Sequence, residues 1–208
     1  MDVVKLGILG GTFDPIHNGH LALAQSVQQA LKLDQVLFAP AGEPPHKRGM
    51  PITPALQRLK MVELALAGQP GFAVSRVDLD RPGPHYTVET VALLRAEYHL
   101  AAEACFFIIG SDSLAALPTW HEPERLLSLC RLAVIHRPGY RPRLTDLAAL
   151  WPNLSAKITW VEMPTNFISS TRLRRQIEWG EDVTGLIPPA VLAYIRQLGL
   201  YGARPVSL

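Results

Sequence analysis

The chain has 208 residues, of which 48% are hydrophobic and 18% charged, a balance typical of a globular fold with one sizeable core. A formal net charge of +2 without blocks of like charge argues against a nucleic-acid groove and against a membrane-binding face. Because no apolar segment approaches the length of a membrane span and the first residues lack a leader pattern, we expect one cytoplasmic domain covering residues 1–208.

Short β-branched or aliphatic runs alternate with segments of helical periodicity along the chain. The predicted strands lie near residues 3–9, 35–39, 72–75, 104–109, 131–136 and 157–162. The predicted helices lie near residues 18–32, 54–67, 87–99, 170–179 and 189–198. This alternation predicts an α/β fold, a three-layer Rossmann-like parallel sheet with helices on both faces. We expect the helices of about 169–199 to pack as a small helical subregion, and residues 138–152 to be irregular.

The first predicted strand leads into a glycine-rich segment, GGTFDPIHNGH, at residues 10–20. Gly10 and Gly11 can adopt backbone angles closed to other residues and can leave N–H groups bare for a ligand. Asn18 is a good cap for the helix that follows, whose positive end would then point into the loop. His17 and His20, three residues apart, can face the same anion. The segment therefore favours phosphate binding.

Two other interpretations of His17 and His20 remain open. The rings can be ordinary polar loop residues bonded to nearby carbonyl groups. They can also form a metal pair, although the segment supplies no cysteine and no glutamate as further ligands. The strings GxxxxGK[ST] and GxGxxG are missing from the segment, so it is neither a Walker loop nor the dinucleotide fingerprint.

Two later loops carry groups suited to charged ligands. The basic loop at residues 42–49 contains His46 and Lys47, and it can fold over a phosphate or be a plain surface loop. Thr87, in the string HYT, is the predicted cap of the helix at 87–99. The first N–H groups of that helix can receive a carboxylate, or Thr87 can be no more than a cap.

The strand at 104–109 is followed by Gly110 and then by Asp112, at the carboxyl end where parallel sheets bind ligands. Asp112 can accept hydrogen bonds from ribose hydroxyls or cap the next short helix. Trp120 can stack on a flat cationic ring or be a core tryptophan.

The two cysteines are Cys105, in a predicted strand, and Cys130, just before another. Such positions are typical of buried free thiols rather than of a disulfide. We expect no chemistry from either.

A second candidate anion site lies at residues 168–175, ISSTRLRR. Ser169 or Ser170 can cap a helix that runs to about Trp179, where Gly180 stops it. Hydroxyls, free N–H groups and arginines then converge at one positive helix end, which suits the outer phosphates of a nucleotide. The alternative is a capped surface helix with solvated arginines.

The two segments together resemble a known superfamily. GGTFDPIHNGH is similar to the [GT]xFxPxHxGH signature of the nucleotidyltransferases, and ISSTRLR resembles their ISSTxxR motif. The strings PPHK, YT, GSDSLAALPTW, RPGY and ISSTRLR resemble segments of the bacterial nicotinate mononucleotide adenylyltransferases. The resemblance covers nearly the whole chain.

This resemblance implies a role for particular positions. The implied catalytic residues are His17, His20 and Arg174. The implied ATP contacts are Gly10, Gly11, Thr12, Phe13, Lys47, Gly110, Asp112, Ile168, Ser170 and Thr171. The implied contacts to the acceptor are His46, Tyr86, Thr87 and Trp120.

The resemblance also implies a reaction, in which AMP passes from ATP to the 5′-phosphate of nicotinate mononucleotide. The expected partners are these two nucleotides, with Mg²⁺ bound through the ATP phosphates because no carboxylate cluster forms a dedicated site. One alternative is a related adenylyltransferase acting on nicotinamide mononucleotide or phosphopantetheine. The other is a sensor that holds ATP without turning it over.

Overall fold

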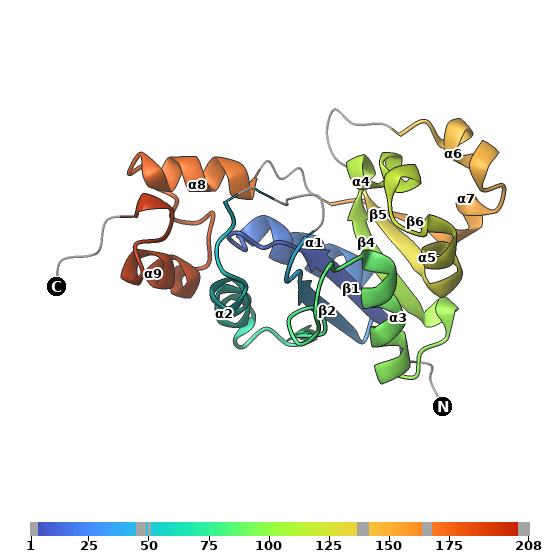
Figure 1. Cartoon of the computed structure of the whole chain (residues 1–208), viewed down its shortest axis with the longest axis horizontal. Coiled ribbons are helices and arrows are strands. Elements are labelled where there is room, and N and C mark those ends of the chain that lie inside the picture. Colours follow the sequence, from blue (N-terminus) through green and yellow to red (C-terminus); the bar gives the residue numbers. More distant parts are fainter. Residues whose placement is uncertain (1–3, 45–48, 50, 137–141, 164–167, 204–208) are drawn as a thin grey trace.

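The computed structural model describes residues 4–44, 49, 51–136, 142–163 and 168–203 (Figure 1). These parts contain one six-stranded parallel sheet with the order β3-β2-β1-β4-β5-β6. The strands are β1 (Leu6–Gly11), β2 (Gln35–Pro40), β3 (Phe72–Val74), β4 (Cys105–Gly110), β5 (Arg131–Ile135) and β6 (Ile158–Val161). Each predicted strand is confirmed, with its ends moved by no more than a few residues.

The side chains of each strand point alternately to the two faces of the sheet, and both faces are apolar. Helices cover both faces and bury these side chains in two cores. In β2, Val36 and Phe38 point into the first core, and Leu37 and Ala39 into the second. The first core is covered by α1 (Asn18–Leu31), α2 (Ala55–Leu66), α8 (Ser170–Glu178) and α9 (Pro189–Gln197). The second is covered by α3 (Thr87–Glu97), α4 (Ser111–Ala115), α5 (Pro123–Leu129), α6 (Leu144–Leu150) and α7 (Leu154–Lys157). The predicted three-layer α/β fold is confirmed.

The strand order reverses beside β1, which pairs with β2 on one side and with β4 on the other. The chain leaves β1 toward one half of the sheet and leaves β4 toward the other half. In doubly wound sheets the crevice between two such diverging connections is where ligands bind. The GGTFDPIHNGH segment and Gly110 therefore leave neighbouring strands at the edge of the sheet where such a crevice is expected.

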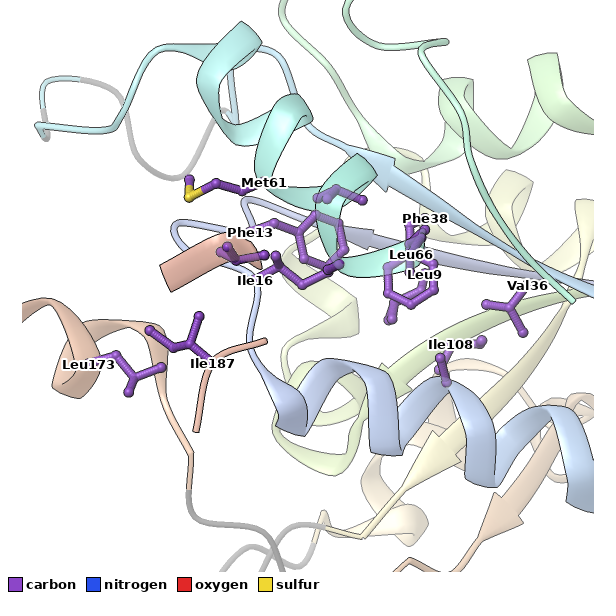
Figure 2. Packing of buried hydrophobic residues seen from close by; sticks show 14 of the residues in the cluster. Leu9, Phe13, Ile16, Val36, Phe38, Met61, Leu66, Ile108, Leu173 and Ile187 are labelled. Carbon is purple, nitrogen blue, oxygen red and sulfur yellow. The ribbon is translucent and has the colours of Figure 1, made fainter. Parts of the chain in front are cut away.

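The C-terminal helices close on the loop between β1 and α1. Ile16, Leu173 and Ile187 are at most 1% exposed and belong to one core cluster, which Figure 2 shows in close-up. Burying an aliphatic side chain of this size stabilises a fold by about 1.5–3 kcal/mol, so these contacts hold α8 against the loop. We keep the single domain with a helical subregion at 169–199 as a proposal.

The prediction that residues 138–152 are irregular is wrong in part, because α6 occupies Leu144–Leu150. Its seven residues are too few to show a clear helical period, and α5 and α7 were missed for the same reason. Short 3₁₀ turns lie at η2 (Ala102–Ala104), η3 (Leu117–Thr119) and η4 (Leu200–Gly202). None of the helices in the described ranges has both the length and the apolar character that crossing a membrane requires.

Candidate active site

The two glycines of the first motif end strand β1 instead of forming a loop. Gly10 and Gly11 pair in register with Ala39 and Pro40, and neither has a positive φ. The expected use of unusual backbone angles there is therefore wrong. What glycine supplies is space, because a Cβ on Gly11 would lie 3.0 Å from the Phe13 ring. Gly10 is exposed at the crevice, where its backbone is accessible to a ligand.

The left-handed turn of the segment falls on Phe13, with φ 50°. A non-glycine residue in this region costs on the order of 1–3 kcal/mol and persists only where its surroundings fix it. The Phe13 ring is 2% exposed. It packs 5.8 Å from the Phe38 ring and edge-on to the His20 ring at 5.1 Å, centre to centre. Burial of this ring therefore holds the loop in shape beside the histidines.

The structure brings the two predicted histidines together. Their rings stack with centres 3.7 Å apart and planes 19° apart. The prediction that Asn18 caps α1 is wrong, because His17 is the N-cap and its backbone N–H donates to Nδ1 of His20 over 3.3 Å. The side chain of Asn18 instead donates to the Gly185 carbonyl over 2.7 Å.

One backbone N–H group that we expect to bind the anion already has a partner within the protein. The backbone N–H of Asn18, at the positive end of α1, donates to the Leu186 carbonyl over 2.9 Å. The predicted anion site includes this group among the free N–H groups of the helix end. The predicted anion site therefore has one N–H group fewer at the start of α1 than the sequence indicates.

The second predicted segment meets the first. Nη1 of Arg174 donates to the Asp14 carbonyl over 2.8 Å, and Oγ of Ser170 donates to the Pro15 carbonyl over 3.0 Å. Ser169 caps α8, as one of the two predicted alternatives, by accepting the N–H of Arg172. Two segments about 155 residues apart in the chain thus lie side by side.

The remaining predicted members of this segment take different positions. Thr171 is exposed in the first turn of α8, where its hydroxyl is accessible to a ligand. Ile168 is half-buried and packs against the first core. Thr12, from the first motif segment, is half-buried in the loop after β1.

A buried polar network beneath this site was not predicted. Arg58, which is 1% exposed, donates to the carbonyl groups of Thr12, Gly42 and Thr53 over 2.7, 3.0 and 2.9 Å. Its position at helical spacing with Met61, Val62 and Ala65, all buried, was a signal that this arginine faces the core.

Asp14 is the acid of the same network. Its carboxylate is 3% exposed and accepts the Tyr201 hydroxyl over 2.6 Å and the Thr53 N–H over 3.4 Å. Burial lowers the pKa of Arg58, and the negative charge of Asp14 opposes that change. Burial, and then the hydrogen bond to Asp14, raises the pKa of Tyr201. No local pattern marked Tyr201, because its partner lies 187 residues earlier in the chain.

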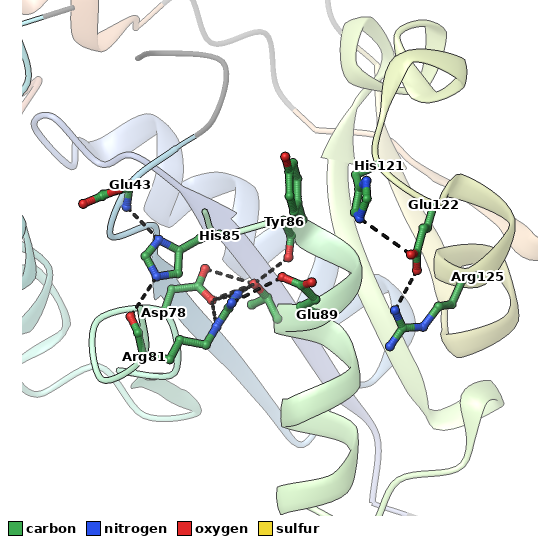
Figure 3. Close-up of polar contacts among 10 residues, drawn as sticks. Glu43, Asp78, Arg81, His85, Tyr86, Glu89, His121, Glu122 and Arg125 are labelled. Atoms are coloured by element: carbon green, nitrogen blue, oxygen red, sulfur yellow. Dashed lines mark hydrogen bonds and ion pairs between the residues drawn. The ribbon is translucent and has the colours of Figure 1, made fainter. Parts of the chain in front are cut away.

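The predicted acceptor contacts gather at the start of α3. The expected cap, Thr87, is the first helical residue, and Tyr86 occupies the N-cap position. The Tyr86 ring stacks on His121 with centres 4.1 Å apart, and Figure 3 shows the two rings facing each other. Trp120, next to His121 in the chain, is half-buried with its ring edge-on to Phe107 at 6.1 Å. His46 and Lys47 lie outside the described residues.

Gly110 and Asp112 stand at the carboxyl end of β4. Gly110 is the N-cap residue of α4, so the alternative in which Asp112 caps that short helix is wrong. Asp112 lies in the first turn of α4 and is half-buried. The contact of Asp112 with ribose hydroxyls stays a prediction.

Metal donors do not cluster in the described ranges: no three His, Cys, Asp or Glu side chains there form a group able to hold an ion. The Asp14 carboxylate, which lies nearest the loop, already accepts two hydrogen bonds from the protein.

Comparisons with known proteins agree with this geometry. The family model "Cytidylyltransferase-like" matches residues 8–176. A "Probable nicotinate-nucleotide adenylyltransferase" of Thermomicrobium roseum is 47% identical over 95% of this chain and 91% of its own. One from a Roseiflexus species is 46% identical over 97% of this chain and the whole of its own.

The fold is also that of solved structures. The chain is similar to Plasmodium falciparum nicotinic acid mononucleotide adenylyltransferase complexed with NaAD, with a TM-score of 0.78 and 19% identity. The match covers 96% of this chain and 98% of that one. The same enzyme complexed with APC gives a TM-score of 0.76.

Proposed function

Because this chain belongs to the cytidylyltransferase-like family, and within it to the nicotinate-nucleotide adenylyltransferases, we propose that it transfers AMP from ATP to nicotinate mononucleotide. The products are nicotinate adenine dinucleotide and pyrophosphate, in a step of NAD synthesis. Family membership confirms the resemblance first drawn from the two sequence motifs. We expect the enzyme to act in the cytoplasm.

One observation carries the proposal. The two motif segments meet through the hydrogen bonds of Arg174 and Ser170 to the Asp14 and Pro15 carbonyl groups. This contact holds the Arg174 guanidinium, the stacked imidazoles of His17 and His20, and the exposed start of α8 at one end of the crevice. Positive charge and donors gathered at one point suit the triphosphate of ATP.

The proposed chemistry needs little proton transfer from the protein. The second pKa of a phosphate monoester is about 6, so the attacking acceptor phosphate is already ionised near neutrality. Catalysis then rests on holding its oxygen in line with the α-phosphorus and on stabilising the charge that develops on pyrophosphate. We assign that stabilisation to His17, His20 and Arg174, with Lys47 as a further ATP contact. Mg²⁺, carried in by ATP, supplies charge neutralisation on the phosphates.

The remaining contacts divide between the two substrates. We assign the triphosphate to the backbone of Gly10, Gly11, Thr12 and Phe13 and to Ile168, Ser170 and Thr171. The adenosine lies at Gly110 and Asp112. The nicotinate nucleotide lies at His46, Tyr86, Thr87 and Trp120, where the tryptophan ring can stack on a pyridinium and gain about 0.5–2 kcal/mol of cation–π attraction.

The test is product formation by the purified chain. ATP is mixed with nicotinate mononucleotide, and release of pyrophosphate and formation of the dinucleotide are measured. Parallel reactions replace the acceptor with nicotinamide mononucleotide or with phosphopantetheine. We expect the highest kcat/KM with the nicotinate acid. Equal kcat/KM for acid and amide would remove the proposed acceptor preference, and ATP binding without pyrophosphate release would favour the sensor.

A further inference from the structure

We propose that His85 is a positioning residue that fixes the loop after β2 against the start of α3 and so sets the register between the two substrate sites. This inference rests on the proposed function, because it takes Tyr86 and Thr87 as acceptor contacts. His85 is 7% exposed, and it is the residue directly before this pair. No part of the proposed chemistry uses its imidazole.

Both ring nitrogens of His85 are bound to backbone groups of different segments. The N–H of Glu43 donates to Nδ1 over 2.8 Å, and Nε2 lies 3.1 Å from the Arg81 carbonyl oxygen. Figure 3 shows the ring between these two partners. A single tautomer satisfies both contacts, with Nδ1 unprotonated and Nε2 carrying the hydrogen. The ring therefore links two stretches of main chain in its neutral form.

The partner on the Arg81 side is itself fixed. The Arg81 guanidinium donates twice to Oδ1 of Asp78, over 3.2 and 2.8 Å, and Asp78 also accepts the Thr90 hydroxyl over 2.8 Å. Thr90 belongs to α3. The backbone at Arg81 is consequently fixed relative to α3. Through its two hydrogen bonds, His85 holds Glu43 at a fixed distance from that backbone.

The loop after β2 is shaped to accept this contact. A Cβ on Gly42 would lie 2.7 Å from the Asp78 carbonyl oxygen and 2.7 Å from Cε1 of His85, so only glycine fits between them. The Gly42 carbonyl accepts Nη2 of Arg58 over 3.0 Å. The backbone at Gly42 and Glu43 is thus held by Arg58 on one side and by His85 on the other.

Arg58 extends the link to the other substrate site, because it also donates to the carbonyl of Thr12 in the loop after β1. A continuous chain of contacts therefore runs from the triphosphate loop through Arg58, Gly42 and His85 to the acceptor helix. In a reaction between two bound nucleotides, a misplacement of about 1 Å can cost on the order of 100-fold in rate. The register that His85 sets is therefore of functional consequence.

The experiment compares two substitutions that each keep one of the two contacts. In His85→Asn, Oδ1 takes the place of Nδ1 and can still accept the Glu43 N–H. In His85→Gln, the longer amide reaches the Arg81 carbonyl but loses the Glu43 contact. For each protein we measure KM for nicotinate mononucleotide, KM for ATP, kcat, and hydrogen exchange of the Glu43 amide.

We expect His85→Gln to lower kcat about tenfold, because the two substrates are then held out of register, and to raise KM for nicotinate mononucleotide. Exchange at Glu43 should be faster, and KM for ATP should change less than about twofold. His85→Asn keeps the Glu43 contact and loses only the Arg81 contact, so Glu43 should stay protected and the kinetic change should be smaller than in His85→Gln. Gly42→Ala, which pushes the same backbone from the other side, should reproduce the kinetic effect of His85→Gln. It also tests the proposal if the histidine variants fold poorly.

The proposal is overturned if the two histidine variants behave alike, or if Glu43 exchanges faster in His85→Gln while kcat and KM for the acceptor are both unchanged. Failure of the proposed function would look different. In that case the wild type itself would release no pyrophosphate from ATP and nicotinate mononucleotide.

Discussion

Three of the four carbonyl groups from Thr12 to Pro15 accept a hydrogen bond from a side chain. The donors are Arg58, Ser170 and Arg174. Carbonyl oxygens carry partial negative charge and repel phosphate, and two of these donors are cationic. Pairing the oxygens in this way offsets the repulsion at the place where we propose that the triphosphate binds.

His20 combines the proposed catalytic role with a structural one, because its Nδ1 accepts the His17 N–H at the start of α1. We expect His20→Ala to lower kcat at least about tenfold through lost transition-state stabilisation. It should also cost about 1 kcal/mol of stability through the lost cap. Pyrophosphate release and thermal unfolding measure the two effects.

His20→Asn separates these effects, because the asparagine side chain can still accept the His17 N–H. Its kcat should fall as far as in His20→Ala, while its stability stays closer to the wild type. Wild-type turnover in the asparagine variant would remove His20 from the proposed catalytic set.

Arg58 supports three carbonyl groups and balances the buried Asp14 carboxylate. Arg58→Met should therefore destabilise the fold by about 3–5 kcal/mol. The substitution leaves three buried carbonyl groups without their donor and removes the positive charge that compensates the buried Asp14 carboxylate. The free energy of unfolding in urea measures this loss. Lys60→Met is the matched control on the same helix, because the Lys60 side chain is half exposed and its ion pair with Glu63 spans 3.6 Å at the surface. Equal losses in the two variants would show that Arg58 does not support the loop.

At the scale of elements, the sheet could be predicted almost completely, but the helix ends could not. Strands such as β4 are continuous apolar runs between turn residues, and that signal is local. The cap of α1 is decided by distant contacts instead. Asn18 has the better intrinsic capping propensity, yet Gly185 and Leu186 take its side chain and its N–H.

The residues of the candidate site also divide into those marked by a local sequence pattern and those defined by distant contacts. The histidines and the α8 segment stood out in the sequence because each forms a dense local motif. Tyr201 and His85 have their importance only through partners that lie 187 and 42 residues away. Arg58 is intermediate, because its place on the apolar stripe of α2 was readable but its three carbonyl partners were not.

Two neighbouring serines at the start of α8 should separate helix stability from substrate binding. Ser169 is the N-cap, and Ser169→Ala should cost about 1 kcal/mol with little effect on KM for ATP. Ser170→Ala removes the donation from Oγ to the Pro15 carbonyl that holds α8 against the loop after β1. It should therefore raise KM for ATP about fivefold, the size expected for one neutral hydrogen bond of about 1 kcal/mol. Thermal unfolding and initial rates at varied ATP test the pair. A larger effect on KM from Ser169→Ala would reverse the assignment.

At the scale of the whole molecule, both faces of the sheet contribute to one crevice. The first core carries α8 and the loop after β1, where we propose that the triphosphate binds, and the second carries the start of α3 and Trp120. The sheet edge at β1 and β4 is the place where these two sets of residues can reach the same pair of substrates. The stability of both cores is therefore a condition for activity.

The second core contains a source of alkaline instability. Cys105 and Cys130 are buried free thiols there, as predicted. Burial raises the pKa of Cys105 from 9.0 to about 12 and raises that of Cys130 further. In the unfolded chain both thiols ionise near pH 9, so above that pH the unfolded state binds fewer protons than the folded state. The stabilisation that comes from keeping both thiols protonated in the folded state is fully present below pH 9. It is lost as the pH rises toward the pKa values that the thiols have in the folded protein.

We therefore expect the free energy of unfolding to fall above pH 9 by up to about 1.4 kcal/mol per pH unit for each thiol. The double variant Cys105→Ala with Cys130→Ala should be less stable at pH 7, because it leaves small cavities, but its stability should decline less steeply between pH 9 and about pH 10. Above pH 10 both proteins should decline further, because the raised pKa of Tyr201 acts in the same direction. Urea unfolding at half-unit pH steps measures the slopes, and parallel curves for the two proteins would contradict the assignment to the thiols.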